Sequence, residues 1–182
     1  MMRYIDAYPF GLVRSGFAMT VWGVLLILGG VISQWGNLPY PGGFLALWGV
    51  ITVVGLAVQG LCQVEHQPSN YFVWIGAIGL GWAFTLFVIY VTNFSLFSEL
   101  APAWLLLLGL AYLHTGYKID SRFYTLGIIH LALALIFEIA WRGVVKIDFL
   151  VNYTTVIFAV LAGVAVLAAA YYARLHVMAR RA

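Results

Sequence analysis

Charged residues are scarce in this 182-residue chain, since nine Lys or Arg and six Asp or Glu make up only 8% of it. A soluble domain carries about 25% charged residues, so this composition excludes a water-exposed globular protein. Cysteine is equally scarce, because Cys62 is the single one and no disulfide can form within the chain. The basic residues stand in ones and twos, which argues against a nucleic-acid partner.

Apolar residues are abundant instead, with 64% hydrophobic residues and a mean hydropathy of +1.01. Residues 15–64 contain no charged side chain at all. A charge near the centre of a bilayer costs a few kcal/mol, and a crossing helix needs about 20 apolar residues. The sequence therefore predicts an all-α, polytopic integral membrane protein whose main partner is the lipid bilayer.

Turn-forming or polar segments divide the apolar sequence at residues 36–43, 67–70, 93–95 and 118–122, and the charges of Arg142, Lys146 and Asp148 separate the last two stretches. Each intervening stretch is long enough for one crossing at about 1.5 Å per residue. We therefore predict a single domain, residues 1–182, that forms a bundle of six transmembrane helices. The expected helices cover about residues 15–35, 43–63, 70–93, 101–117, 122–141 and 149–173.

The distribution of Lys and Arg predicts the orientation, because cytoplasmic loops carry an excess of both. Six crossings return the chain to the side on which it starts. With both termini in the cytoplasm, the outer face carries only Arg142 and Lys146. The inner face carries Arg3, Arg14, Lys118, Arg122, Arg174, Arg180 and Arg181. We predict an integral protein of the plasma (cytoplasmic) membrane with both termini cytoplasmic.

The six helices group into three hairpins of similar length, which predicts an internal repeat. Gly23, Gly76 and Gly127 mark the hairpins at spacings of 53 and 51 residues. Residues 22–24 and 48–50 are both Trp-Gly-Val, but this echo at 26 residues relates successive helices. Apolar sequence of low complexity also produces such echoes by chance, so a true repeat and chance are both open.

Two stretches, residues 22–30 with the later Pro39 and residues 106–116, are similar to the small six-helix membrane proteins of the acid-resistance HdeD-like family. The resemblance covers about half of the chain and depends on the spacing of Gly and Leu. The third hairpin departs from the family pattern, since residues 168–170 are alanines where a closing Gly is expected. The resemblance implies a six-helix membrane protein and supplies no catalytic residues.

A few polar residues lie where apolar ones are expected. His130 is near the middle of the fifth helix, Glu138 follows it on much the same face, and Arg142 follows Glu138 at an ion-pair spacing. Tyr112 and His114 lie at the inner end of the fourth helix. These five residues are our candidates for a polar path along the seam of helices 4 and 5. The alternative is structural: Glu138 and Arg142 pair at the interface, and His130 bonds to a neighbouring helix.

No cofactor is predicted, although haem b stays open as an alternative because paired histidines ligate it. In a hairpin that turns near residue 119, His114 and His130 lie roughly 9 Å apart along the membrane normal, which does not suit one iron. His66 and His176 fall in the inner loop and the inner tail. The zinc motif His-Glu-x-x-His and the Gly-x-Ser-x-Gly motif are both missing, so a non-enzymatic protein is favoured over an enzyme.

Two functions from different classes follow from these observations. The first is a conduit or sensor for a proton or a small solute that uses the polar seam. The second is an accessory or anchoring subunit of a larger membrane complex, such as a respiratory one. Small residues on the sixth helix predict either an internal contact or an interface for a homo-oligomer or larger complex. They are Ala162, Ala165, Ala169 and Ala173.

Overall fold

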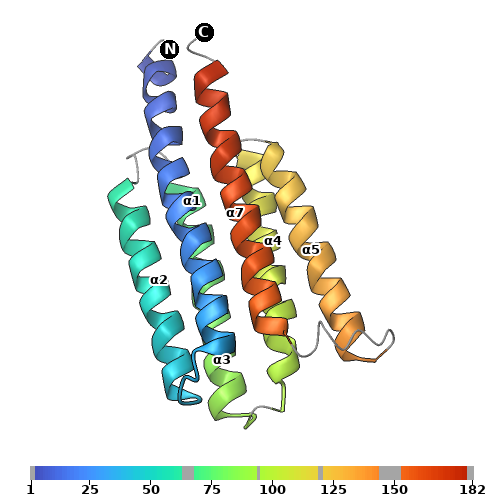
Figure 1. The fold of residues 1–182 in the computed structure, drawn as a ribbon. Coiled ribbons are helices and arrows are strands. Elements are labelled where there is room, and N and C mark those ends of the chain that lie inside the picture. The colour runs from blue at the N-terminus through green and yellow to red at the C-terminus, as the bar shows by residue number, and fades with distance from the viewer. Residues whose placement is uncertain (1–2, 63–67, 94, 119–120, 144–152, 180–182) are drawn as a thin grey trace. The chain divides into compact units, whose positions relative to one another are not determined.

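A computed structural model describes residues 3–62, 68–93, 95–118, 121–143 and 153–179. Side chains are described for residues 16–61, 72–93, 95–96, 98–118, 121, 123–143 and 153–171. In these ranges the chain is helical and contains no strand (Figure 1). The helices are α1 (Arg3–Trp35), α2 (Gly42–Cys62), α3 (Pro68–Tyr90), the short 3-10 helix η1 (Phe97–Glu99), α4 (Leu100–Lys118), α5 (Arg122–Trp141) and α7 (Thr154–Ala179).

Six of these helices are long and apolar enough to cross a membrane. The predicted all-α class with six transmembrane helices is therefore confirmed. α1 starts at Arg3, well before the start expected near residue 15. α7 is described from Thr154, and its expected start at residue 149 lies outside the described residues.

An asparagine in the left-handed region lies within three residues of the end of both α1 and α3. Asn37 follows α1 with a φ of 48°, and Asn93 follows α3 with a φ of 46°. Asparagine adopts this conformation more readily than most residues, so it can reverse the chain directly after a helix. After Asn37, the backbone N–H of Gly43 donates to the carbonyl of Pro39 at 2.6 Å, where α2 begins.

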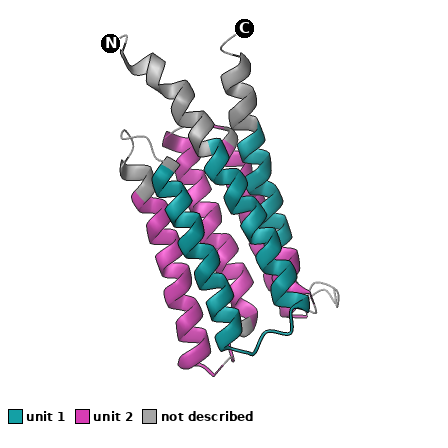
Figure 2. Ribbon diagram, turned by 60° about the vertical axis from the view of Figure 1, so that its left-hand side comes forward, with its two compact units in different colours: residues 1–66, 159–182 teal, residues 67–158 magenta. Residues whose placement is uncertain are grey.

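The chain divides into two compact units (Figure 2). Unit 1 comprises residues 1–66 and 159–182 and therefore holds α1, α2 and most of α7. Unit 2 comprises residues 67–158 and holds α3, η1, α4, α5 and the first residues of α7. Each unit has helix contacts of its own, and the candidate residues of the helix 4 and 5 seam all belong to unit 2.

In unit 1, two indole N–H groups join α1 to α2. Trp22 donates from α1 to Oε1 of Gln59 at 3.0 Å, and Trp48 donates from α2 to Oγ of Ser33 at 3.0 Å. The ring of Trp22 occupies the space that a side chain at Gly55 would need. The two tryptophans therefore fasten the hairpin from both sides, each with its N–H satisfied away from water.

A pair of glycines lets α1 and α7 approach closely in the same unit. A Cβ on Gly23 would lie 2.8 Å from the carbonyl oxygen of Gly163, and one on Gly163 would lie 2.7 Å from that of Gly23. Small residues permit this kind of backbone approach in membranes. Ala162 and Ala169 of the predicted small-residue ridge are also buried within the chain. Their burial favours the internal contact of the two alternatives.

In unit 2, indole N–H hydrogen bonds join α3 to α4, as they join α1 to α2 in unit 1. Trp104 donates from α4 to Oγ1 of Thr85 at 3.1 Å, and a Cβ on Gly81 would lie 2.6 Å from the ring of Trp104. Trp74 donates from α3 to Oγ1 of Thr115 at 3.0 Å. We call each such indole N–H bond between neighbouring helices a tryptophan clasp. Each of the two hairpins, α1–α2 and α3–α4, has two clasps.

One sequence spacing accompanies all four clasps. Each helix carries a tryptophan, a glycine or alanine seven residues later, and the acceptor of the partner's clasp four residues after that. The four sets are Trp22, Gly29 and Ser33; Trp48, Gly55 and Gln59; Trp74, Gly81 and Thr85; and Trp104, Ala111 and Thr115. This recurrence covers two hairpins, and the repeat of three hairpins stays a prediction.

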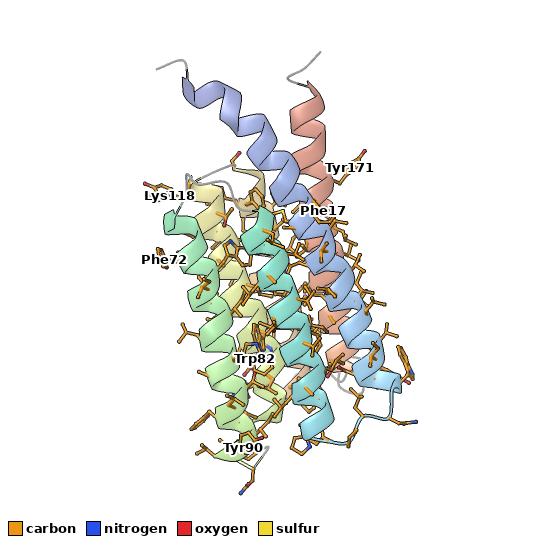
Figure 3. All side chains as sticks on the ribbon, turned by 90° about the vertical axis from the view of Figure 1, so that its left-hand side faces the viewer. Phe17, Phe72, Trp82, Tyr90, Lys118 and Tyr171 are labelled. Carbon is orange, nitrogen blue, oxygen red and sulfur yellow. The ribbon has the colours of Figure 1, made fainter. Side chains whose placement is uncertain are left out.

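Large apolar side chains cover the exposed faces of the helices. Val53 and Leu61 on α2 are exposed, as are Phe72 and Leu80 on α3. Figure 3 shows Phe72 and Tyr90 projecting from α3 near its two ends. Such faces are stable in contact with lipid chains and unfavourable in water, which supports lipid as the surrounding medium.

Candidate functional site

His130 is the fully buried polar residue at the middle of α5, with an exposed fraction of 0%. Its Nδ1 lies 2.8 Å from the carbonyl oxygen of Leu126, one turn earlier in the helix. A carbonyl oxygen can only accept, so Nδ1 carries the proton of the neutral ring. The other nitrogen, Nε2, is buried and has no hydrogen-bond partner among the described residues. It therefore presents an unused lone pair inside unit 2.

The ring of Tyr112 contacts this imidazole and is itself in contact with aromatic rings on α3 and α5. The buried ring of Tyr112, on α4, has its centroid 4.9 Å from that of His130, at an angle of 43°. Tyr112 stacks on Phe123 of α5 with a centroid distance of 6.3 Å. It also meets Trp74 of α3 edge to face at 4.9 Å. We call these four residues the Tyr112–His130 cluster.

Thr115 of α4 binds Trp74, the residue that α3 contributes to the Tyr112–His130 cluster. Its hydroxyl accepts the indole N–H of Trp74 and donates to the carbonyl oxygen of Ala111 at 2.8 Å. Thr115 is buried, so both bonds are made away from water. Because a satisfied hydroxyl fixes the indole, Trp74 is oriented edge-on against Tyr112.

Glycines bring α4 and α5, which lie side by side in Figure 1, close enough for the ring contact. A Cβ on Gly127 would lie 2.7 Å from Leu113 and 3.0 Å from the carbonyl oxygen of Gly109. Nearer the turn, a Cβ on Gly116 would lie 2.8 Å from the backbone nitrogen of Tyr124. The two backbones are in contact over two turns, which sets the register of Tyr112 against His130.

A cluster of buried apolar residues follows His130 toward the end of α5. Ala134 and Phe137 of α5 pack with Ala101 and Leu105 of α4. Partly buried apolar side chains on α5 and at the start of α7 complete the cluster, namely Leu133, Ile157 and Phe158. The Tyr112 ring therefore borders His130 on one side, and an apolar core follows it along α5 on the other.

Glu138, Arg142 and Glu99 meet at the far end of α5. Arg142 donates through Nε to Oε1 of Glu138, so the ion pair that the spacing allows is present. Burial, the hydrogen bond to Glu138 and the charge of Glu138 raise the pKa of the Glu99 carboxyl, whereas the charge of Arg142 lowers it less. The hydrogen bond with Glu138 raises the pKa of the Arg142 guanidinium. These contacts join η1 to the end of α5.

His114 lies outside the Tyr112–His130 cluster. It is two residues from Tyr112 on α4, and side chains two residues apart on a helix point about 200° away from each other. Its Nε2 is buried and lacks a hydrogen-bond partner among the described residues. Of the five predicted path residues, the structure thus brings Tyr112 to His130 and Glu138 to Arg142, and it separates His114 from the first pair.

The residues that support the site, namely Trp74, Thr115 and Phe123, are not among the five predicted path residues. A usable signal was present, because the echo between Trp22 and Trp48 at 26 residues continues to Trp74 at the same spacing. Within the described part of the chain, no group of three or more His, Cys, Asp or Glu side chains is placed to hold a metal ion.

Comparisons with protein-family models, curated proteins and solved structures give no match to this chain. The resemblance to the HdeD-like family therefore stays a prediction from the spacing of Gly and Leu. The functional argument depends on the geometry of unit 2.

Proposed function

We propose that this integral membrane protein senses protons through His130 at the α4–α5 seam. The observation that carries the proposal is the unused Nε2 lone pair of a fully buried, neutral imidazole. A lone pair without a donor is a base, and histidine is the side chain that takes up a proton most readily near neutral pH. An exposed fraction of 0% leaves no accessible surface for a larger solute, which favours the proton as the ligand.

The buried threonines of unit 2 differ from His130 in that their hydroxyls are fully paired. The hydroxyls of Thr85 and Thr115 each donate to a carbonyl and accept from an indole. Buried polar groups in proteins are usually paired in this way, because an unpaired group costs free energy. Among the described residues, buried nitrogens without a partner also occur on His114 and Trp141, but of these three residues only His130 is buried as a whole. Proton uptake is the role that we propose for its unpaired Nε2.

The ring of Tyr112 supports the protonated state. Its centroid lies 4.9 Å from the imidazole centroid, within the distance of about 6 Å at which an aromatic ring attracts a cation. An imidazolium in this apolar place would still be costly, so protonation favours any rearrangement of α4 and α5 that gives Nε2–H an acceptor. Proton uptake is thereby coupled to the packing of the two helices.

A sensor accounts for the seam better than a conduit does. A conduit would need polar groups between His130 and Glu138, but Phe137 and Leu105 pack there in the apolar core. The proposal places the protein in the plasma membrane with both termini in the cytoplasm, supported by the seven-to-two distribution of Lys and Arg.

The deciding experiment is an NMR titration of the full chain in lipid nanodiscs with ¹⁵N-labelled histidine. Comparison with His130→Asn identifies the His130 signal, and the asparagine amide still donates toward the Leu126 carbonyl. We expect the His130 ring to change from the Nδ1–H tautomer to imidazolium between about pH 8 and about pH 4. A ring that stays neutral over this range in folded protein would refute the proposal.

The accessory-subunit function is the alternative, and the contact of His130 with Tyr112 across two helices favours it. On that reading the imidazole only fills space between α4 and α5. His130→Asn would then lower the melting temperature modestly, with no change in pH response, and the protein would purify with stoichiometric partners. Proton flux into liposomes separates the sensor from a conduit. We expect the same flux for the wild type, His130→Asn and Glu138→Gln.

A further inference from the structure

We propose that protons reach His130 from one membrane face only, the face at which the turn between α4 and α5 lies. This inference rests on the proposed function, since it presumes that His130 takes up a proton. We call the direction from His130 toward the end of α4 at Lys118 and the start of α5 at Arg122 the turn side, and the direction toward Glu138 the core side.

Hydrogen-bonding groups occupy the turn side. The glycine contacts place Thr115 and Gly116 of α4 beside the first turns of α5, nearer the turn than His130 is. The Thr115 hydroxyl, the Trp74 indole N–H and the Tyr112 ring follow one another from there to the imidazole. The hydroxyl and the indole N–H bond to each other, and each can bind a water molecule when this bond opens, so a proton can approach His130 along this side.

Apolar side chains occupy the core side. Residues 131–137 of α5 are all Leu, Ala, Ile or Phe, and they span about 10 Å of helix at 1.5 Å per residue. Phe137 and Leu105 are buried against each other's helices in this stretch. The indole N–H of Trp104 on the same level of α4 bonds to Thr85 as that of Trp74 bonds to Thr115, but among the described residues no ring contact links this clasp to the imidazole. A proton or water molecule in this region would have no polar partner, which makes passage unfavourable.

Few titratable groups face the imidazole, so the two sides differ mainly in polarity. Tyr112 faces it from α4, and the ring that Tyr112 meets on α3, Trp74, has no titratable group. On α5 the next titratable group toward the core side is Glu138, about two turns after His130, and Glu138 is paired with Arg142. His114 leaves α4 in nearly the opposite direction from Tyr112.

The test uses the full chain in liposomes sorted into two populations, with the α4–α5 turn facing either outward or inward. Cysteine labelling at Ser121 verifies the orientation in a Cys62→Ser background. An external pH jump in a stopped-flow instrument is followed by tryptophan fluorescence, and His130→Asn defines the part of the signal that depends on His130. We expect a fast His130-dependent phase with the turn outward. With the turn inward, we expect only a slow phase that a protonophore accelerates.

A matched pair of variants separates the route from helix packing. Thr115→Val and Thr85→Val each remove one tryptophan clasp and one bond to a carbonyl, but only Thr115 lies on the turn side. We expect Thr115→Val to slow the fast phase and Thr85→Val to leave its rate unchanged.

The remaining outcomes are distinct. A fast phase in both orientations, or only with the turn inward, would overturn one-sided access while leaving His130 as the proton acceptor. No His130-dependent signal in either orientation, even with the protonophore, would overturn both this inference and the proposed function.

Discussion

The hairpins α1–α2 and α3–α4 use one design with different consequences. In the first, Trp22 and Trp48 each donate an indole N–H to the opposite helix. In the second, Trp74 and Trp104 do the same from corresponding positions. Both loops contain an asparagine of positive φ. Shared spacing, clasps and loop conformation indicate that one pattern of residues specifies both hairpins.

The hairpins differ in what the clasps support. The acceptors in α1–α2 are Ser33 and Gln59, and the described contacts of these clasps stay within that hairpin. In α3–α4, Trp74 is bound by Thr115 and also packs against Tyr112, which reaches His130 on α5. In the α3–α4 hairpin, therefore, a tryptophan clasp that joins the two helices also supports Tyr112, the neighbour of His130.

The largest expected effect concerns direction across the membrane. If both hairpins run the same way, their loops emerge on one face, and cysteines at Asn37 and Ser98 should both be labelled from outside intact cells. Cysteines at Ser69 and Ala179 should be labelled only after permeabilisation. The measurement uses an impermeant thiol reagent in a Cys62→Ser background. Labelling of Asn37 and Ser98 from opposite faces would show that the two hairpins do not cross the membrane in the same direction.

The second prediction tests the glycines under the tryptophan rings. Gly81→Val should destabilise unit 2 by about 1–3 kcal/mol, since the new side chain would displace the Trp104 ring. Gly76→Val is the matched control on α3, because a Cβ there meets nothing within 4 Å. Unfolding in SDS with detergent micelles measures both.

The α1–α2 hairpin provides the parallel pair for this test. Gly55 lies under the ring of Trp22, and Gly49 on the same helix has nothing within 4 Å of its Cβ position. Gly55→Val should therefore be destabilising and Gly49→Val nearly neutral. Equal effects of the two α2 variants would mean that the spacing in this hairpin has no role in packing.

The sequence was sufficient for the number of helices, because charges and turn formers mark the ends of each apolar stretch. It also located His130 near the middle of a helix and paired Glu138 with Arg142, since both follow from spacing along one element. It could not show that Tyr112, and not His114, faces His130. That choice depends on how α4 is rotated against α5, which the glycine contacts between the two helices determine.

The third prediction measures the clasps as pairs. A double-mutant cycle with Trp104→Phe and Thr85→Val should give a coupling of about 0.6 kcal/mol, the average for hydrogen bonds between membrane helices. Trp22→Phe with Gln59→Leu should give a similar value in the first hairpin. The hairpins should differ in one readout, because Trp74→Phe should shift the His130 NMR signal and Trp104→Phe should not. Equal shifts from both would contradict the placement of Trp74 in the cluster.

The smallest expected effect is a pH dependence found only in the second hairpin. Its loop leads into Glu99, whereas residues 36–41 of the first loop contain no carboxyl group. Burial and Glu138 raise the pKa of Glu99 in the folded protein, so the folded state holds that proton more tightly than the unfolded state. This contribution to stability is complete below the ordinary pKa of the carboxyl and is lost as pH rises through the raised one.

Glu99→Gln should therefore remove a fall in melting temperature with rising pH across that acidic window. The change should correspond to less than about 1 kcal/mol, because Glu99 is partly exposed and screened by solvent. Melting curves of the wild type and Glu99→Gln at a series of acidic pH values measure the difference. Asn37→Asp is the control, because it places a carboxyl group in the first loop, where residues 36–41 supply no other acid. If the wild type and Glu99→Gln lose stability in parallel as pH rises, the contact between Glu99 and Glu138 does not hold a proton. The ends of the two hairpins would then be electrostatically alike, and the difference between them would rest on Trp74 and Tyr112 alone.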